Sequence, residues 1–162
     1  MSKKNYWLMK SEPDVYSIED LERDGREPWN GIRNYQARNF LRDTMQVGDL
    51  ALFYHSNASP PGVAGVMKVV SGPEPDELAF DPDSTYFDPK SNPEEPTWIQ
   101  RQMEFVEKFR RFIPLQELKE DPALEEMLVV RKGQRLSIQP MEKEHFDHIC
   151  RLGKRLNFAK RG

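Results

Sequence analysis

Residues 29–42, WNGIRNYQARNFLR, combine the side-chain types that suit an aromatic base and its phosphate. Trp29 offers an indole for stacking, and the segment also holds three arginines and no acidic residue. An indole beside a helix N-terminus and a row of guanidinium groups fit such a ligand. The same residues also fit a core Trp beside a solvated helix face. Residue types alone favour this second interpretation, because short motifs often match by chance.

The elements that must position this segment follow from local signals. Asn30-Gly31 predicts a turn directly after Trp29, and Asn34 can cap a short helix that follows the turn. One stripe of this helix, at spacing i, i+3 and i+4, is apolar and is expected to face a core: Ala37, Phe40 and Leu41. A second stripe, at i, i+4 and i+8, is polar and cationic: Asn34, Arg38 and Arg42.

The charge of the chain is unevenly distributed. The 162 residues carry a formal charge of −3, yet residues 71–96 hold eight acidic residues and one lysine and so account for −7. The rest of the chain is therefore at +4, so the acidic pI of 5.7 does not argue against a nucleic-acid ligand. We expect a single domain over residues 1–162, with a Pro- and acid-rich excursion at 71–96 and a basic tail at 151–162.

Composition also limits the class and location of the protein. The single cysteine excludes an internal disulfide framework, and no apolar stretch approaches the ~18 residues of a membrane span. No signal peptide is apparent, because the lysines near the N-terminus precede no apolar run. We therefore expect a monomer that is cytoplasmic, or nuclear in a eukaryote, with no membrane partner.

The remaining chain reads as short strands and helices. Strands are expected at 6–9, 50–54, 62–70, 98–109, 128–130 and 136–139, and helices at 17–21, 114–118, 122–127 and from about residue 140 onwards. Arg101 interrupts the apolar row of the 98–109 strand, and Gly62 and Gly65 mark a bulge or a close backbone approach. Ser11 and Glu12 leave a strand on a Pro-bounded turn, and loops on a rigid scaffold often carry binding groups.

The excursion at 71–96 is long for a segment without order, so it is either functional or disordered. Its middle holds two adjacent aromatic residues, Tyr86 and Phe87. Because exposed aromatic side chains are costly, we expect both to be pinned to the core. The excursion is then a docked segment that folds over a pocket.

Five motifs in order resemble the EVE domain: YWLMKSEP at 6–13, WNGIRNYQARNFL at 29–41, GDLALFYHSN at 48–57, YFDPK at 86–90 and LSIQP at 136–140. This resemblance implies an α+β, PUA-like fold, a small and strongly bent β-barrel flanked by short helices. The family is related to YTH and ASCH domains, and many members of this wider group bind RNA or modified nucleic acid. EVE domains in particular are implicated in reading modified cytosines in DNA.

The resemblance also implies a site. YTH domains grip one extruded base in an aromatic cage, and by position the turn after the first strand and the indole before the next helix match that cage. The hydroxyls of Ser11 and Ser56 and the carboxamides of Asn34 and Asn57 would then read the base edge. Arg33 and Arg38 would hold phosphate. Tyr86 or Phe87 would supply a second aromatic wall. The full set of expected binding residues is Lys10, Ser11, Glu12, Trp29, Asn30, Arg33, Asn34, Tyr35, Arg38, Ser56, Asn57, Tyr86 and Phe87.

Enzymatic alternatives have weaker support in the sequence. His145 and His148 are spaced i, i+3 on a helix but lack further metal ligands, and Cys150 lies on the apolar stripe of that helix. His55 beside Ser56 shows neither a nucleophile elbow nor an oriented third group. We expect no catalytic residue, metal or cofactor, and DNA or RNA with a modified base as the partner. An RNA-modifying or nucleotide-processing enzyme using the same pocket, or an adaptor that docks a basic protein on the acidic excursion, remain the alternatives.

Overall fold

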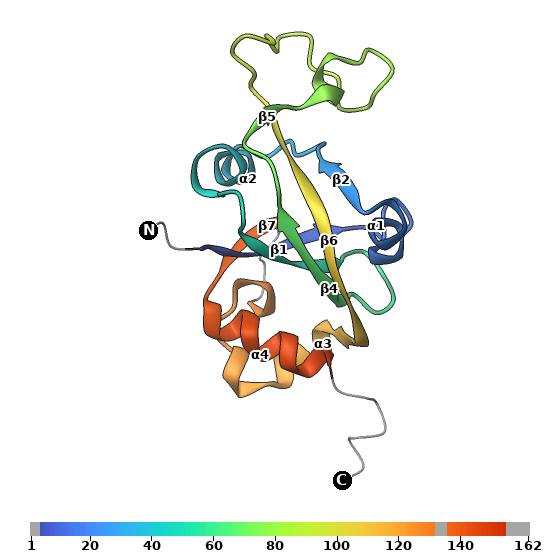
Figure 1. Ribbon diagram of the computed structural model, residues 1–162, viewed down its shortest axis with the longest axis vertical. Helices are drawn as coiled ribbons and strands as arrows, with labels where there is room; N and C mark the ends of the chain where they lie inside the picture. The colour runs from blue at the N-terminus through green and yellow to red at the C-terminus, as the bar shows by residue number, and fades with distance from the viewer. Residues whose placement is uncertain (1–3, 132–135, 155–162) are drawn as a thin grey trace.

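Figure 1 shows a computed structural model of the chain, which describes residues 4–131 and 136–154. The strands are β1 (Tyr6–Ser11), β2 (Arg26–Trp29), β3 (Leu50–His55), β4 (Gly62–Val69), β5 (Glu74–Pro75), β6 (Ile99–Pro114) and β7 (Ile138–Met141). The α-helices are α1 (Ile18–Asp24), α2 (Tyr35–Asn39), α3 (Leu115–Glu120) and α4 (Lys143–Gly153). Four further short turns are the π-helix η1 (Phe40–Thr44) and the 3₁₀ turns η2 (Glu77–Phe80), η3 (Pro122–Leu124) and η4 (Leu128–Val130).

The strands form one mixed, bent sheet in the order β2-β6-β4-β3-β1-β7, with β5 paired to β6. Strands β1 and β3 are parallel, and the other pairs are antiparallel. Within the described ranges β2 and β7 end the sheet and do not pair with each other. The predicted α+β fold with a bent sheet is therefore confirmed, but the expected barrel stays open.

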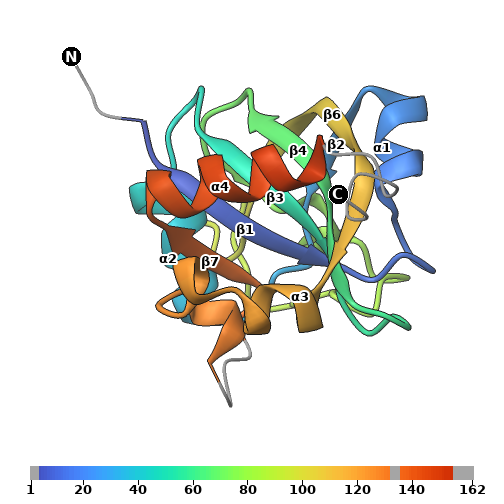
Figure 2. The same ribbon diagram turned by 90° about the horizontal axis from the view of Figure 1, so that it is seen from below.

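Each face of the sheet carries its own hydrophobic core. Successive side chains of a strand point to opposite faces, so Trp7 and Met9 of β1 pack into one core with Leu21 and Leu41, from the α1 and α2 side. Leu8 packs into the other core, which α3, α4 and the neighbouring turns cover. Figure 2 shows α4 lying across this second face. Trp7 is only 1% exposed, so it is a core residue.

Two glycines allow β4 to lie close against β6, as the sequence suggested. A Cβ atom at Gly65 would overlap the carbonyl oxygen of Glu107, and one at Gly62 would overlap that of Ile113. The register between β4 and β6 also shifts on either side of Gly65. The glycines therefore mark both a close approach and an irregular, strongly bent part of the sheet.

Arg101 does not break the apolar row of β6 but is buried within it. Its guanidinium donates to the carbonyl oxygens of Leu41, at 2.7 Å, and Met45, at 2.5 Å, and also to that of Ser71. The first two carbonyls belong to the end of the α2–η1 helix, where helix hydrogen bonding runs out. The buried cation thus ties this helix to β6.

The helix that precedes these carbonyls forms as predicted. Asn34 Oδ1 accepts from the Ala37 amide at 3.0 Å, which caps α2, and Ala37 and Leu41 are fully buried. Ser17 caps α1 through a capping box, and Gly25 ends this helix.

The chain between β6 and α4 differs from the prediction. The helix expected at 122–127 is only the single 3₁₀ turn η3, and the strand expected at 128–130 is the 3₁₀ turn η4. Val129 fills the second core from this turn, so an apolar run that suggested a strand is explained by burial alone. The outer edge of β1 is taken by β7, which starts at Ile138 and not at residue 136. Residues 132–135, and residues 155–162 of the expected basic tail, lie outside the described residues.

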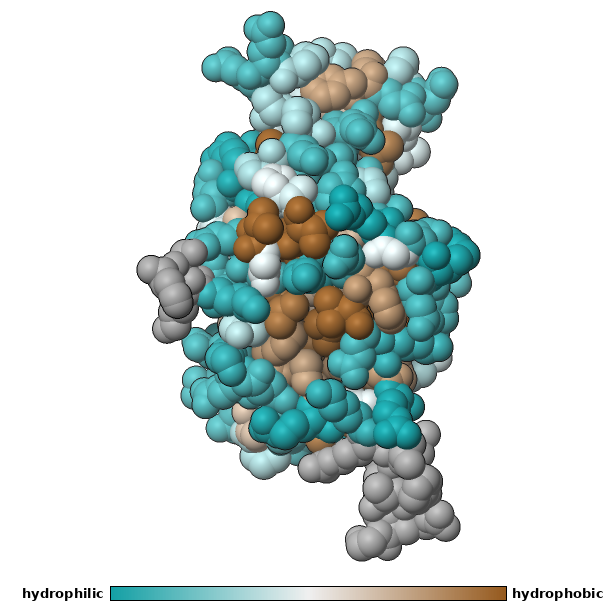
Figure 3. Space-filling model, in the orientation of Figure 1, coloured by the Kyte–Doolittle hydropathy of each residue, from teal (hydrophilic) through white to brown (hydrophobic). Residues whose placement is uncertain are grey.

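The surface agrees with these layers. In Figure 3 the excursion at the top is largely hydrophilic, whereas apolar side chains gather across the middle of the face. No helix in the described part of the chain is long and apolar enough to cross a membrane.

Candidate nucleic-acid interface

A pocket of about 580 Å³ lies where β1 and β2 end, and we refer to it as the β1–β2 pocket. Seven of the thirteen expected binding residues line it: Lys10, Ser11, Glu12, Trp29, Asn30, Ser56 and Tyr86. The other residues in its walls were not expected from the sequence: Val15, Tyr16, Glu27, Pro28, Gly31, Ile32 and Ser137.

The parallel pairing of β1 and β3 brings the first polar groups together. Ser11 lies opposite His55 in the register, and the Ser56 amide donates to the Ser11 carbonyl at 3.0 Å. Because the strands run in the same direction, the turns that follow them leave from the same edge of the sheet. This placement positions Ser11 and Ser56, which are 45 residues apart, in one wall.

The turn after β1 is closed by its own hydrogen bonds. The Ser11 hydroxyl donates to the Tyr16 carbonyl at 2.6 Å, and the Tyr16 amide donates to the Glu12 carbonyl at 2.8 Å. The Glu12 carboxylate accepts from Asn57 Nδ2 at 3.0 Å, which joins this turn to the loop after β3. The Ser11 hydroxyl can still accept a hydrogen bond from a ligand, since its donor alone is used.

Trp29 satisfies both interpretations of the sequence. Its side chain is only 7% exposed and packs edge-on against Phe53, with ring centroids 5.5 Å apart at 87°. It also forms part of the pocket wall, because it ends β2 just before the turn at Gly31. Trp29 is therefore a core residue that also lines the pocket.

The excursion is docked to this wall by a buried ion pair. The Asp76 side chain is fully buried, and its Oδ2 accepts from the Gly31 amide at 2.8 Å and from Arg33 Nη1 at 2.9 Å. Arg33 also donates through Nε and Nη2 to the Tyr86 carbonyl, at 3.2 and 2.7 Å. All three guanidinium nitrogens of Arg33 therefore have protein acceptors, which counts against the expected phosphate contact.

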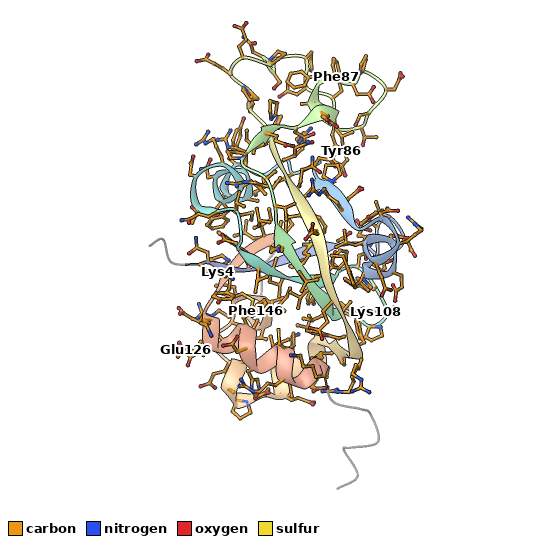
Figure 4. The ribbon with its side chains drawn as sticks, in the orientation of Figure 1. Lys4, Tyr86, Phe87, Lys108, Glu126 and Phe146 are labelled. Carbon is orange, nitrogen blue, oxygen red and sulfur yellow. The ribbon has the colours of Figure 1, made fainter. Side chains whose placement is uncertain are left out.

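Tyr86 closes one side of the pocket, whereas Phe87 lies outside it. A Cβ atom on Gly31 would lie 3.1 Å from Cε2 of Tyr86, so the ring packs directly on this turn. Figure 4 shows Tyr86 next to β2 and Phe87 higher within the excursion. The expectation that both rings are pinned to the core is wrong, since they are 43% and 40% exposed. The excursion nevertheless folds over a pocket through Tyr86, as predicted.

The remaining expected residues form a separate stack beside the pocket. Tyr35 stacks on Trp98 with ring centroids 5.0 Å apart at 29°, and the Arg38 guanidinium lies 5.0 Å from the Tyr35 centroid. Arg38 also donates to the Thr97 carbonyl at 2.6 Å. Tyr35 is 61% exposed, so this stack extends the surface next to the pocket and contributes no wall.

Similarity to known proteins agrees with this geometry. The sequence matches the EVE domain over residues 5–152. The chain belongs to the EVE domain family. It is 42% identical to mouse thymocyte nuclear protein 1, over 91% of this chain and 73% of that protein.

Solved structures of EVE relatives have the same fold. A Pseudomonas syringae protein, 48% identical, superposes with a TM-score of 0.86 over 91% of this chain and 99% of its own. Human THYN1 protein, crystallised in complex with DNA that contains 5-methylcytosine, is 42% identical, with a TM-score of 0.85 over 94% and 99% of the two chains. A YTH domain from Zygosaccharomyces rouxii, 14% identical, shares the fold with a TM-score of 0.54 over 97% and 91% of the chains.

The charges in the pocket of this EVE domain are of both signs. Burial lowers the pKa of Lys10, whose ammonium lies 5.9 Å from the centroid of the Tyr54 ring. Burial, and then the nearby Asp24 and Asp20, raise the pKa of Glu27. The pocket thus offers one partly desolvated cation and carboxylates, so charge alone does not make it a phosphate site.

Sequence reasoning missed Glu27 because no strand was expected before the turn at Asn30-Gly31. Residues 26–29 form strand β2, paired to β6 with Pro28 opposite Gln102. Alternation along a strand would have placed Glu27 on the same side as Trp29. Ser137 had no such signal, since only the pairing of β7 with β1 brings it to the pocket.

In the described part of the chain, the side chains considered for catalysis or metal binding lie in other surroundings. Nε2 of His55 accepts from the Ile18 amide at 3.1 Å and so is already used, and burial lowers the pKa of this histidine. Burial likewise raises the pKa of the Cys150 thiol to about 11. His148 lies 2.7 Å from an oxygen of Asp121, and residues 4–131 and 136–154 contain no group of three or more His, Cys, Asp or Glu side chains that could hold a metal.

A second hollow of about 840 Å³ lies between α4 and the turns η3 and η4. It is larger than the β1–β2 pocket but contains none of the expected residues and no aromatic wall. Glutamates, histidines and arginines make up half of its lining residues, including His145, His148 and Arg151. We therefore assign function to the β1–β2 pocket, where aromatic and polar groups converge.

Proposed function

We propose that this protein is a nucleic-acid reader that holds one flipped-out, modified base in the β1–β2 pocket, with 5-methylcytosine in DNA as its ligand. The observation that carries the proposal is the pocket itself: two aromatic residues, Trp29 and Tyr86, line it together with polar groups from the turns after β1 and β3. Human THYN1, which has the same fold and 42% identity, was crystallised with DNA that contains this base.

The pocket has suitable dimensions and energetics for this role. Its volume of about 580 Å³ lies within the range of ~300–1,000 Å³ that is usual for small-ligand pockets. Extruding a base costs a few kcal/mol, and stacking on one aromatic ring returns roughly 1–3 kcal/mol. Because Arg33 is engaged by Asp76, it is not free to hold phosphate, so affinity is expected to be modest and only weakly salt-dependent.

The enzyme and adaptor alternatives are less well supported. A nucleophile needs a base within hydrogen-bonding reach, yet the Ser11 hydroxyl donates to a carbonyl and His55 accepts from a backbone amide. We further infer that residues 1–162 are one domain, since both cores share one sheet, and we propose that the protein is a monomer. The cytoplasm, or the nucleus in a eukaryote, is the proposed location.

The test compares two neighbouring aromatic residues of the excursion. Tyr86→Ala removes the exposed ring that flanks the pocket and is expected to weaken binding of a single-stranded oligonucleotide with one 5-methylcytosine by roughly 5- to 150-fold, the equivalent of ~1–3 kcal/mol. Phe87→Ala removes a ring of similar exposure, 40% against 43%, that does not line the pocket, and is expected to bind like the wild type. Trp29→Ala is less suitable, because emptying a core position costs ~3–5 kcal/mol of stability.

Binding is measured by fluorescence anisotropy with matched strands that carry cytosine or 5-methylcytosine, and folding is checked by thermal melts. The mass of the recovered oligonucleotide is expected to be unchanged, because a reader binds the base without modifying it. Equal binding by wild type and Tyr86→Ala, or equal losses in both variants, would contradict a base held against Tyr86.

A further inference from the structure

Glu27 is a half-buried acid that lines the pocket, and the proposed function assigns it no contact with the base. It lies on β2 two residues before Trp29, so both side chains are on one side of the strand, and both line the pocket. Among the described residues its carboxylate has no hydrogen-bond donor and no cationic partner. The other pocket acid, Glu12, differs because it accepts from Asn57 Nδ2 at 3.0 Å.

The surroundings of Glu27 make a charged carboxylate without a partner unfavourable. Burial is the largest influence on its pKa and raises it, and the nearby carboxylates Asp24 and Asp20 raise it further. A carboxylate that has lost water and faces like charges gains most from a ligand that donates hydrogen bonds. The acceptor-only oxygens of a carboxylate equally disfavour a ligand that presents a carbonyl oxygen at the same place.

Pyrimidine bases differ in whether the group at C4 donates or accepts a hydrogen bond. Cytosine and 5-methylcytosine carry an amine at C4, which donates, whereas thymine carries an oxygen there, which accepts. Thymine also keeps the methyl group of 5-methylcytosine, so these two bases differ only at C4 and at the neighbouring N3, which accepts in cytosine and carries a hydrogen in thymine. A carboxylate that accepts from the cytosine amine is an established form of base recognition.

We propose that Glu27 selects the amino base in this pocket by accepting a hydrogen bond from its exocyclic amine, and so excludes thymine. This inference rests on the proposed function, because it assigns a specificity residue within the same pocket. It separates two tasks: Glu27 recognises that the base is a cytosine, and other groups in the walls respond to its methyl group.

The test uses three single-stranded oligonucleotides that differ only in one base: 5-methylcytosine, cytosine or thymine. Wild-type protein is expected to favour 5-methylcytosine over thymine by roughly 5- to 150-fold, which is the discrimination of one good side-chain contact to a base. In Glu27→Gln this preference should largely disappear, since the amide can present either an oxygen or an NH₂ group. The preference for 5-methylcytosine over cytosine should be unchanged.

Two controls keep the result interpretable. Glu22→Gln removes the same charge from an exposed position of α1 and should keep both preferences. Glu27→Gln should fold at least as well as the wild type, because the raised pKa means that the charged carboxylate is unfavourable in the folded protein. A thermal melt of each variant checks this point.

The outcomes separate this inference from the proposed function. If wild type prefers 5-methylcytosine over cytosine but does not distinguish it from thymine, or if Glu27→Gln keeps the wild-type ratio, the role of Glu27 is refuted and the reader function stands. If wild type binds none of the strands, the reader function fails, and the role of Glu27 is refuted with it.

Discussion

Replacing Arg33 by alanine is expected to destabilise the fold, although the sequence suggested a contact with phosphate. The Arg33 guanidinium donates to the fully buried carboxylate of Asp76 at 2.9 Å and to the carbonyl of Tyr86 at 2.7 Å. Arg33→Ala would leave the Asp76 charge buried without its cation. The excursion would also lose two of the hydrogen bonds that hold Tyr86 beside the pocket.

The size of the effect follows from the burial of the two partners. Removing one member of a buried ion pair costs ~3–5 kcal/mol of stability. The Arg33 side chain keeps 21% exposure, so we expect the lower end, about 3 kcal/mol for Arg33→Ala. Asp76→Ala should approach about 5 kcal/mol, because the amides of Gly31 and Leu78 lose their acceptor as well. For a domain of this size, 3 kcal/mol lowers the melting temperature by roughly 6–12 °C.

The assay is urea and thermal unfolding of wild type, Arg33→Ala, Asp76→Ala and the double variant. Because the two residues act as a pair, the double variant should be little worse than Asp76→Ala alone. Arg23→Ala is the matched control: its partners Asp20 and Asp24 lie on the surface, so water screens the charges and the melting temperature should hardly change. Two results together would refute this reasoning and favour a phosphate contact instead. Arg33→Ala would lose less than about 1 kcal/mol of stability, and the slope of log K against log salt concentration for DNA binding would fall by about 1.

Two further predictions concern His55 and Gly31. The pKa of His55 is lowered by burial, so below its ordinary value of 6.5 the unfolded chain takes up the proton more readily than the folded one. The free energy of unfolding should therefore fall as the pH drops from about 6.5, by at most about 1.4 kcal/mol per pH unit. Urea unfolding at pH 7 and 5 should show a smaller fall for His55→Gln than for the wild type. Equal falls in the two proteins would contradict this role of His55. Gly31→Ala should cost about 1–2 kcal/mol in a thermal melt, since Gly31 has φ +78°, and should also weaken 5-methylcytosine binding because its Cβ lies 3.1 Å from the Tyr86 ring. An unchanged melting temperature would show that this turn accepts a side chain.

Local sequence signals determined much of the fold. The cap at Asn34, the capping box at Ser17 and the end of α1 at Gly25 depend on residues within four positions of one another, and all three are observed. The buried strands β1 and β3 were equally clear, because runs such as Leu50–His55 have few alternatives to burial. Five ordered motifs also identified the EVE domain family, which the match over residues 5–152 confirms.

Tertiary structure decided where the side chains act. The three arginines of residues 29–42 looked alike in sequence, yet Asp76, 43 residues from Arg33, converts one of them into half of a buried ion pair. Equally, the sequence offered Tyr86 and Phe87 as equivalents, and only the packing of Tyr86 on Gly31 distinguishes them.

The pocket itself is the clearest case. Its walls come from β1, β2, the loop after β3, the excursion and the start of β7, segments that meet only when the sheet forms. Glu27 illustrates the physical reason. By residue type a single Glu is expected on the surface, and only the folded structure shows that its carboxylate is half-buried without a hydrogen-bond donor or a cation among the described residues. The sequence by itself supplied the elements and the family, and the pairing of distant strands decided which side chains face the pocket with groups left to bind.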